Sequence, residues 1–235
     1  MPARDTQSTP AILPLGDAAV LIELGGAVGL EASRRVHALA RRIEVSTAGE
    51  PGWAAPVPGA TSVLVPVDPL EPGTEAAIAR LASIVAERSD VPRVDARGDV
   101  DDAAIIEVGT RYGGVDGPDL DVVAGMTGLT PEEVVARHAS VVYTALFLGF
   151  APGFAYLGPL PSEIAVPRRP VPRTSVPAGS VAIAGPTTAI YPIESPGGWW
   201  IIGRTDLVFW DPRRDPPALL RPGARVRFVP QPGRR

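Results

Sequence analysis

Two residue types are missing from this sequence of 235 residues, and each absence narrows what the chain can do. There is no cysteine, which excludes disulfides, thiolate nucleophiles and cysteine-ligated metals. All 22 basic residues are arginine, so the chain has no lysine for a Schiff base, for a P-loop or for biotin attachment. Recognition of an oxyanion therefore falls to the flat, bidentate guanidinium group of arginine.

Long apolar runs and strong charge are also lacking. No run of about 18 apolar residues could span a bilayer, and the first residues lack the apolar core of a signal peptide. The formal net charge is −4, and the arginines are scattered along the chain, which argues against nucleic-acid binding. We expect a cytoplasmic globular protein that binds neither nucleic acid nor membrane.

Histidine is scarce, so we expect no metal site built on histidine. His37 lies among arginines in an amphipathic segment and is interpreted as a surface or half-buried helix residue. His138 lies near the end of another helical segment, just before an apolar strand, and could either be structural or move a proton. A Ser-His-Asp triad is not favoured, because the chain has no G-x-S-x-G turn and its candidate serines have no local base.

The first ninety residues alternate between strand and helix patterns. A short strand is predicted before the turn at Gly16 and Asp17. Further strands are predicted over residues 18–24 and 61–69, and amphipathic helices over residues 29–45 and 73–90. Thr74 is the expected N-cap of the second helix. This order predicts a small α+β unit with a sheet on one side and helices on the other.

Polar, turn-rich sequence near residue 95 predicts a boundary between two domains, residues 1–95 and 96–235. After it come a strand, two short helices and an apolar strand ending near Gly149. The second helix has a strong start, with Thr130 as N-cap, Pro131 at the first position and Glu133 at the capping-box position.

Beyond Gly149 the helical periodicity ends. Prolines separate short apolar segments that we expect to be strands, which read "SVAIAG", "WWIIG", "LVFW" and "RVRFV". Many short strands with glycine and proline turns are typical of a closed or nearly closed β-barrel. The predicted fold class is therefore α+β, with a mixed N-terminal unit and a C-terminal barrel.

Two features of this second half could carry chemistry. They are arginines in a proline-rich segment and glycines at which the backbone could approach a ligand closely. Arg168, Arg169 and Arg173 lie among prolines, which stiffen the segment and direct guanidinium groups suited to carboxylate, phosphate or bicarbonate. Arg204 follows an apolar strand and could be a rim residue or a ligand clamp. Pro196, Gly197 and Gly198 precede two tryptophans and let a backbone approach a ligand closely.

Four blocks of this sequence occur in the order of one known family, and they read "RYGGVDGPDLDVVAGMTGLTPEEVVARH", "LGFAPGFAYLGPLP", "VPRRPVPRTSVPAGSVAIAG" and "IYPIESPGGWWIIGRT". From about Ile12 to Pro230 the chain resembles the B subunit of prokaryotic 5-oxoprolinase, also called allophanate hydrolase subunit 1. The same family contains the first half of the biotin-dependent carboxyltransferase domain of urea carboxylase, and a sporulation-kinase inhibitor.

This resemblance implies a ferredoxin-like α/β sandwich followed by a cyclophilin-like β-barrel that carries the site. It implies a sister protein, which is the C subunit of the oxoprolinase or a relative of allophanate hydrolase subunit 2. In the oxoprolinase system it also implies an A subunit as a third component. ATP, with magnesium, would be shared with these partners, and biotin would not be attached to this chain.

The resemblance also implies the site. We expect His138, Arg168 and Arg173 to be catalytic. The remaining site residues are expected to bind an amide or lactam substrate, and they are Phe150, Pro152, Gly153, Phe154, Thr187, Tyr191, Pro196, Gly197, Gly198 and Arg204. Glycine and proline would shape a rigid turn while the aromatic rings wall a dry pocket. Thr187 departs from the family, which usually has glutamine there, and this puts the substrate in doubt.

Three functions follow from the resemblance. The first is a subunit of an ATP-dependent 5-oxoprolinase, which opens the lactam 5-oxoproline to glutamate. The second is half of a carboxyltransferase that moves CO2 from carboxybiotin to urea or a similar amide, with biotin on a separate carrier. The third is inhibition of a sensor histidine kinase; a cyclophilin-like shape does not by itself imply prolyl isomerase activity.

Overall fold

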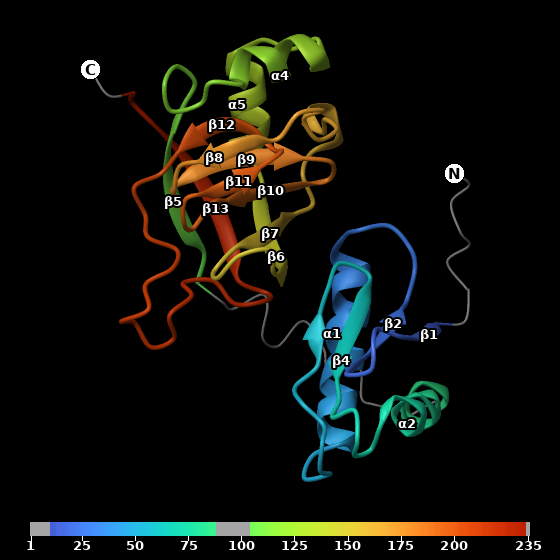
Figure 1. The fold of residues 1–235 in the computed structure, drawn as a ribbon. Coiled ribbons are helices and arrows are strands. Elements are labelled where there is room, and N and C mark those ends of the chain that lie inside the picture. Colours follow the sequence, from blue (N-terminus) through green and yellow to red (C-terminus); the bar gives the residue numbers. More distant parts are fainter. Residues whose placement is uncertain (1–9, 88–103, 234–235) are drawn as a thin grey trace. The chain divides into compact units, whose positions relative to one another are not determined.

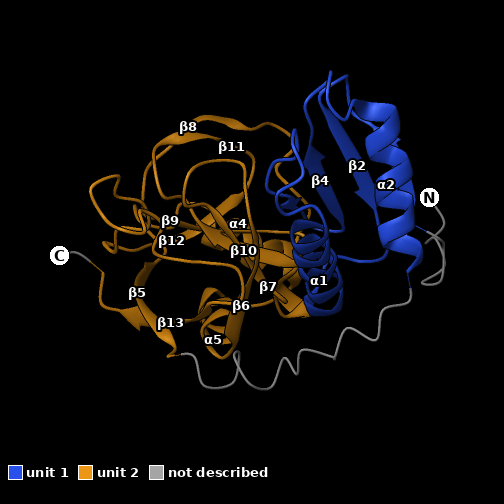
Figure 2. Ribbon diagram, turned by 90° about the horizontal axis from the view of Figure 1, so that it is seen from below, with its two compact units in different colours: residues 1–95 blue, residues 96–235 orange. Residues whose placement is uncertain are grey.

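A computed structural model describes residues 10–87 and 104–233. The chain divides into two compact units, residues 1–95 and 96–235, which are blue and orange in Figure 2. The boundary that the sequence predicts near residue 95 lies outside the described residues. No helix in the described part of the chain is both long and apolar enough to cross a membrane.

The first unit is built on a four-stranded antiparallel sheet with the order β1-β2-β4-β3. Its strands are β1 (Ala11–Pro14), β2 (Ala19–Glu23), β3 (Val57–Pro58) and β4 (Ser62–Pro66). Strand residues alternate between the two faces of the sheet, and Val20, Ile22, Val63 and Val65 all point to the buried face. The period-two pattern of the sequence therefore matches the observed strands.

Two helices cover this buried face, α1 (Leu30–Ser46) and α2 (Thr74–Ala86). Val36, Leu39 and Ile43 recur at helical spacing and pack into the core, as the sequence predicts. The prediction that Thr74 caps α2 is wrong, because Gly73 occupies the N-cap and makes no side-chain cap bond. The Thr74 hydroxyl instead donates to the carbonyl oxygen of Asp17, 2.6 Å away, which ties the helix start to the β1–β2 turn.

The second unit is a closed barrel with the order β10-β7-β6-β13-β5-β12-β9, which confirms the predicted closure. The strands are β5 (Ile106–Tyr112), β6 (Val142–Leu148), β7 (Ala155–Gly158), β9 (Ser180–Ala184), β10 (Thr187–Ile190), β12 (Trp200–Arg204) and β13 (Arg225–Gln231). Only β5 and β13 run parallel among the described strand pairs. The prediction of a strand over "LVFW" is wrong, since that segment is irregular apart from a single bridge at Trp210.

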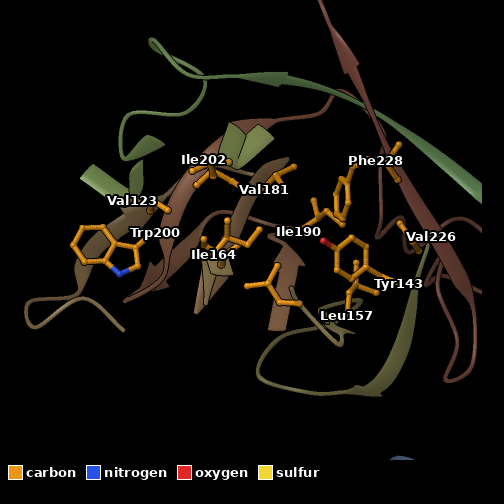
Figure 3. Packing of buried hydrophobic residues seen from close by; sticks show 14 of the residues in the cluster. Val123, Tyr143, Leu157, Ile164, Val181, Ile190, Trp200, Ile202, Val226 and Phe228 are labelled. Carbon is orange, nitrogen blue, oxygen red and sulfur yellow. The ribbon is translucent and has the colours of Figure 1, made fainter. Parts of the chain in front are cut away.

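Large apolar side chains fill the barrel interior. All seven barrel strands contribute to one buried cluster, which also includes residues of the helices that pack on the barrel. Figure 3 shows Tyr143, Leu157, Ile190 and Phe228 gathered between the strands. Successive strand residues point to opposite sides, so the alternate residues of the same strands form a second, outer surface.

Helices α4 (Leu120–Thr127) and α5 (Pro131–Ala139) lie against one another at one end of the barrel (Figure 1). The predicted capping box at the start of α5 is confirmed. The Glu133 amide donates to the Thr130 hydroxyl at 3.2 Å, and the Thr130 amide donates to the Glu133 carboxylate at 2.8 Å. This cap satisfies two amides that a helix start otherwise leaves unpaired.

A short antiparallel pair, β8 (Arg173–Val176) and β11 (Ser195–Gly197), covers part of the outer surface. Val176 belongs to a second buried cluster together with Ala182, Ala184 and Ala189 of the barrel. A single-turn helix, η1 (Ser162–Ile164), precedes this pair in the chain. The barrel is therefore packed on both sides along β9 and β10.

Replacing Thr130 with alanine removes the side-chain half of the α5 cap. We expect the free energy of unfolding to fall by about 1 kcal/mol, measured by urea denaturation followed by tryptophan fluorescence. Thr130→Ser is the matched control, because serine keeps the accepting hydroxyl. Equal loss in both variants would show that the methyl group, and not the cap, carries the effect.

Candidate functional site

Six aromatic side chains gather on the outer surface of the barrel and are called the aromatic cluster below. They are Phe147, Phe150, Phe154, Tyr156, Tyr191 and Trp199. Beneath them, three outward residues of β9 and β10 are alanines, at positions 182, 184 and 189. Because alanine is small, the rings can approach the strands closely and pack to interior density.

Phe154 is the centre of the aromatic cluster and is only 1% exposed. Its ring lies edge-to-face with Tyr156, Tyr191 and Trp199, with centroids 5.0, 5.3 and 5.8 Å away. Tyr156 also stacks on Phe147 at 4.2 Å. These are favoured aromatic geometries, so the cluster is a rigid apolar platform.

The turn before β7 carries the exposed ring of the cluster. Phe150 is 60% exposed and has φ 73°, a left-handed conformation that is unusual for a residue with a side chain. Pro152 is exposed, whereas Gly153 is buried at φ 75°, where a Cβ would make a tight contact with Trp210. This segment therefore combines a turn with aromatic packing, as the sequence predicts. The role of the turn in substrate binding stays a prediction.

Arg168 is exposed and has no hydrogen-bond or ion-pair partner among the residues that the structure describes. The backbone on either side of it is held. The indole of Trp200 donates to the carbonyl oxygen of Pro167 at 2.7 Å, and the amide of Arg169 donates to the carbonyl oxygen of Gly198 at 2.8 Å. Arg168 is thus an unpaired cation on a fixed backbone.

The charge of Arg168 affects the pKa of two tyrosines of the cluster. Burial raises the pKa of Tyr156 and of Tyr191, and in both groups the positive charge of Arg168 opposes that rise. The amide of the next residue, Arg169, donates to Gly198, which directly precedes Trp199 of the cluster, so the backbone that carries Arg168 lies beside the cluster. A positive charge beside apolar rings suits a small organic anion, whose carboxylate meets the guanidinium while its carbon skeleton meets the rings.

Arg169 and Arg173 have a different environment from Arg168. Both donate to the carboxylate of Asp119, which is 3% exposed, at distances of 2.7–3.0 Å. Arg169 also lies 5.0 Å over the ring of Trp200. Of the three arginines that the sequence singles out, two are held by one buried carboxylate, and the catalytic role assigned to Arg173 stays a prediction.

Asp119 is the main residue of this region that sequence reasoning missed. It stands at the N-cap position of α4, yet its side chain makes no cap bond. A carboxylate directly before a helical apolar pattern is normally interpreted as a cap. Only the folded chain shows that this carboxylate accepts hydrogen bonds from two arginines that lie about fifty residues later in the sequence.

His138 lies in the barrel interior and is fully buried. Thr188 donates its single hydroxyl proton to the carbonyl oxygen of Ala182, so its oxygen accepts from Nε2–H of His138 at 2.9 Å. Nδ1 then accepts from the Tyr112 hydroxyl at 2.7 Å. Burial lowers the pKa of His138 to about 3, so the ring is neutral at pH 7.

The geometry separates His138 from the other candidates. Thr188 faces inward to His138, whereas its neighbour Thr187 pairs with Ala184 of the outer cluster. Adjacent strand residues face opposite sides, so the histidine lies behind the strand and not beside Arg168. This placement favours a structural role, and catalysis by His138 stays a prediction.

The remaining candidates lie around the outer surface. The Thr187 hydroxyl donates to the carbonyl oxygen of Ala184 at 3.1 Å, so it closes the hairpin between β9 and β10. Gly197 lies against the Tyr191 hydroxyl, where a Cβ would overlap it, and Pro196 is exposed. Arg204 is half-buried at the end of β12, opposite Ser180.

Metal ligands do not gather in this region. Within residues 10–87 and 104–233 no group of three or more histidine, aspartate or glutamate side chains could hold a metal ion. The candidate site is thus an exposed guanidinium, an aromatic platform and a glycine-lined backbone.

The chain can now be compared with known proteins that are similar to it in sequence or in fold. The family described as carboxyltransferase domain, subdomain C and D, matches residues 10–220, and the chain belongs to this family. It is 44% identical to the 5-oxoprolinase B subunit of Escherichia coli O157:H7, over 92% of this chain and 94% of that protein. The resemblance inferred from the four sequence blocks is confirmed.

Solved structures show the same fold. The crystal structure of TTHA0988 is 35% identical with a TM-score of 0.72, covering 92% of this chain, and the chain spans 40% of that protein. The Kluyveromyces lactis urea amidolyase has a TM-score of 0.77 at 21% identity, and the chain spans 15% of it. At that identity the second likeness concerns the fold alone.

The left-handed backbone of Phe150 predicts an inverted order of stability for two variants. Glycine tolerates this conformation and alanine does not, by roughly 1 kcal/mol. We therefore expect Phe150→Gly to be more stable than Phe150→Ala in urea denaturation, the reverse of the order at ordinary positions. If the alanine variant is the more stable one, residue 150 is not held at positive φ.

The buried His138 predicts a pH dependence of stability. Its folded pKa is depressed, so between pH 6.5 and about 3 the unfolded chain binds the proton that the folded chain excludes. The contribution of His138 to the free energy of unfolding should be complete above pH 6.5. At lower pH it should be lost, by up to about 1.4 kcal/mol per pH unit.

His138→Gln keeps a donor and an acceptor but cannot be protonated. We expect its stability to fall less steeply than that of the unaltered chain between pH 7 and pH 4.5, in urea denaturation at each pH. Identical pH slopes for both proteins would show that His138 is not buried in its neutral form.

Proposed function

We propose that this chain is the B-type subunit of an ATP-dependent 5-oxoprolinase and that its outer barrel surface binds the carboxylate of 5-oxoproline. The observation that carries the proposal is Arg168, an unpaired guanidinium on a fixed backbone beside the aromatic cluster. It is supported by the 44% identity to a 5-oxoprolinase B subunit along almost the whole chain.

5-Oxoproline has an anionic group and an apolar part, which match the guanidinium and the aromatic rings of this surface. 5-Oxoproline is a five-membered lactam with one carboxylate and two ring methylenes. Arg168 would bind the carboxylate through charge-assisted hydrogen bonds, and the methylenes would lie on Phe150, the exposed ring of the cluster. The glycine-lined backbone at Gly197 and Gly198 would lie near the lactam amide, where backbone groups can bind it without a side chain intervening.

Ring opening needs activation, because an unactivated lactam hydrolyses slowly. ATP, with magnesium, would transfer its terminal phosphoryl group to the amide oxygen. Water would then add to the same carbon, and the ring C–N bond would break with the amine as leaving group to give an acyl phosphate. A second water would hydrolyse this acyl phosphate to the glutamate carboxylate and phosphate. The chain has no lysine, so any phosphate contact from it would come from arginine. We assign the nucleotide mainly to the partner subunits, and to this chain the binding and orientation of the lactam.

The partners in this proposal are a sister protein of the C-subunit type and a third component, the A subunit. The proposal rests on the name of the relative, which is one subunit among several, and on the surface of the barrel, where a single exposed arginine supplies only part of a site. The complex would act in the cytoplasm, where ATP is available.

Carboxyl transfer is the second candidate function. Its support is the family match to a carboxyltransferase domain and the urea amidolyase fold likeness. The absence of lysine requires that biotin be carried by another protein. Arg168 would then hold bicarbonate or carboxybiotin oxygen, and Thr187, where the family usually has glutamine, would be the first residue to examine for a changed amide substrate.

For the two units we propose the finer fold names that the resemblance implies. The element order ββαββα of the first unit is the ferredoxin-like order βαββαβ with the last strand moved to the front. The second unit, a closed barrel with helices at one end, is proposed to be cyclophilin-like.

Replacing Arg168 with glutamine tests the function. In a complex with the subunits encoded beside this chain, we expect the KM for 5-oxoproline to rise by about tenfold to a hundredfold, since a charged hydrogen bond contributes about 1.5–3 kcal/mol. Release of glutamate with ATP is the measurement. Arg221→Gln is the control, because Arg221 is another exposed arginine of the same unit and its charge is not among the causes of the Tyr156 and Tyr191 pKa shifts.

Two outcomes would count against the proposal. An unchanged KM in Arg168→Gln would remove Arg168 from the substrate site. Complete lack of glutamate release by a stable complex of the unaltered subunits would reject the lactam as substrate and favour carboxyl transfer.

A further inference from the structure

One buried carboxylate holds the segment that carries Arg168. Each oxygen of Asp119 accepts two hydrogen bonds: Oδ1 from Arg169 at 3.0 Å and Arg173 at 2.7 Å, and Oδ2 from Arg173 at 2.8 Å and the Ile201 amide at 2.7 Å. An ionised carboxylate has about four acceptor sites. The hydrogen-bonding capacity of Asp119 is therefore fully used, and all of it within the protein.

The two arginines bound to Asp119 stand at the two ends of one short loop. Between Arg169 and Arg173 the sequence is Pro170-Val171-Pro172. Proline fixes φ and removes amide donors, so this loop is stiff but makes few backbone hydrogen bonds of its own. The carboxylate thus joins both ends of the loop to the start of α4 and, through Ile201, to β12.

Arg168 directly precedes this held loop and contributes nothing to holding it. Its neighbours are fixed by the Pro167 and Arg169 backbone contacts to Trp200 and Gly198. The Arg169 side chain adds a second anchor, because it both binds Asp119 and lies over Trp200. The direction in which Arg168 leaves the backbone therefore depends on how firmly Arg169 is held.

We propose that Asp119 is a positioning residue, which fixes the loop of residues 169–173 so that Arg168 is held beside the aromatic cluster as an anion-binding group. This inference rests on the proposed function for the substrate it names, 5-oxoproline, but the position of Arg168 can be tested without any substrate. Asp119 itself is buried and touches no ligand.

Removing the charge of Asp119 should release the loop. Two guanidinium groups would remain beside one another without a counter-charge, and each is about three-quarters buried along its side chain. Repulsion between like charges and the loss of three charged hydrogen bonds both favour opening of the loop toward solvent. Arg168 would then no longer be confined near Tyr156 and Tyr191.

Asp116 offers a matched control in the same connection between β5 and α4. It is also buried, at 9% exposed, and it also accepts a hydrogen bond from an arginine, Arg111, at 3.0 Å. Arg111 additionally pairs with Asp206 and makes no contact with residues 166–173 among its described bonds. Asp116→Asn therefore removes a buried, arginine-paired charge without touching the loop.

The first measurement uses the complex with the partner subunits and 5-oxoproline as substrate. We expect Asp119→Asn to raise the KM tenfold or more while kcat changes less than threefold, and Asp116→Asn to leave the KM unchanged even if its melting temperature falls. In the double variant with Arg168→Gln, Asp119→Asn should add no further loss. Full additivity, or an equal rise in KM for both aspartate variants, would overturn the proposal.

The second measurement follows the four tyrosines of the chain alone, by 13C NMR of ζ-labelled tyrosine as pH is raised. Arg168→Gln should raise the pKa of Tyr156 and Tyr191, because the cation that lowers both is removed. Asp119→Asn should raise the same two values, and Asp116→Asn should not. Unchanged tyrosine titrations in Asp119→Asn would show that Arg168 stays in place without the carboxylate.

These two measurements separate the inference from the proposed function. If the unaltered complex releases no glutamate, the proposed function fails while the tyrosine titration still decides whether Asp119 positions Arg168. If Asp119→Asn does not fold, Arg173→Gln is the milder variant, because Asp119 keeps Arg169 as a counter-charge. It should raise the pKa of Tyr156 by a smaller amount, and no shift would overturn the inference. Tyr191 does not serve in this variant, because Arg173 itself lowers the pKa of Tyr191.

Discussion

The barrel strands must pack on two sides at once, and this constraint organises the second unit. Along β9 the residues alternate, so that Val181 and Ile183 fill the barrel while Ala182 and Ala184 face outward. Large residues inside hold the barrel closed. Small residues outside leave space for six aromatic rings, and the candidate site is built on those rings. The site therefore depends on the register of the strands, since a shift by one residue would exchange the two faces.

Two sets of buried polar groups stand out in this unit. Tyr112, His138 and Thr188 form a directed chain of hydrogen bonds inside the barrel. Asp119 forms another set with two arginines on the outside. In both sets the most buried group, His138 or Asp119, has its hydrogen-bonding atoms paired within the protein, so its burial costs little. Arg168 differs because no described residue pairs with it. A cation that the fold leaves unpaired, next to groups whose charges are all matched, is the group available to a ligand.

Local patterns explain which parts of the fold could be predicted. The helices of the first unit follow from Val36, Leu39 and Ile43 at helical spacing, and the start of α5 follows from Thr130, Pro131 and Glu133. Local rules also produced the two errors. Thr74 has the right residue type for a cap, but its hydroxyl binds Asp17 instead. The segment "LVFW" has strand composition, but it only makes one bridge at Trp210. In both cases a contact with another part of the chain outweighed a weak local preference.

The sequence by itself determined the residue types of the site and the barrel class, because turn residues, capping residues and alternating apolar residues act over a few positions. It could not rank Arg168, Arg169 and Arg173, which stand in one proline-rich segment and have the same chemistry. Only the tertiary structure decided that two of them bind Asp119, that His138 lies inside the barrel, and that Arg168 remains exposed. Charge pairing depends on distances between residues that lie fifty or more positions apart, and those distances exist only after the chain has closed the barrel.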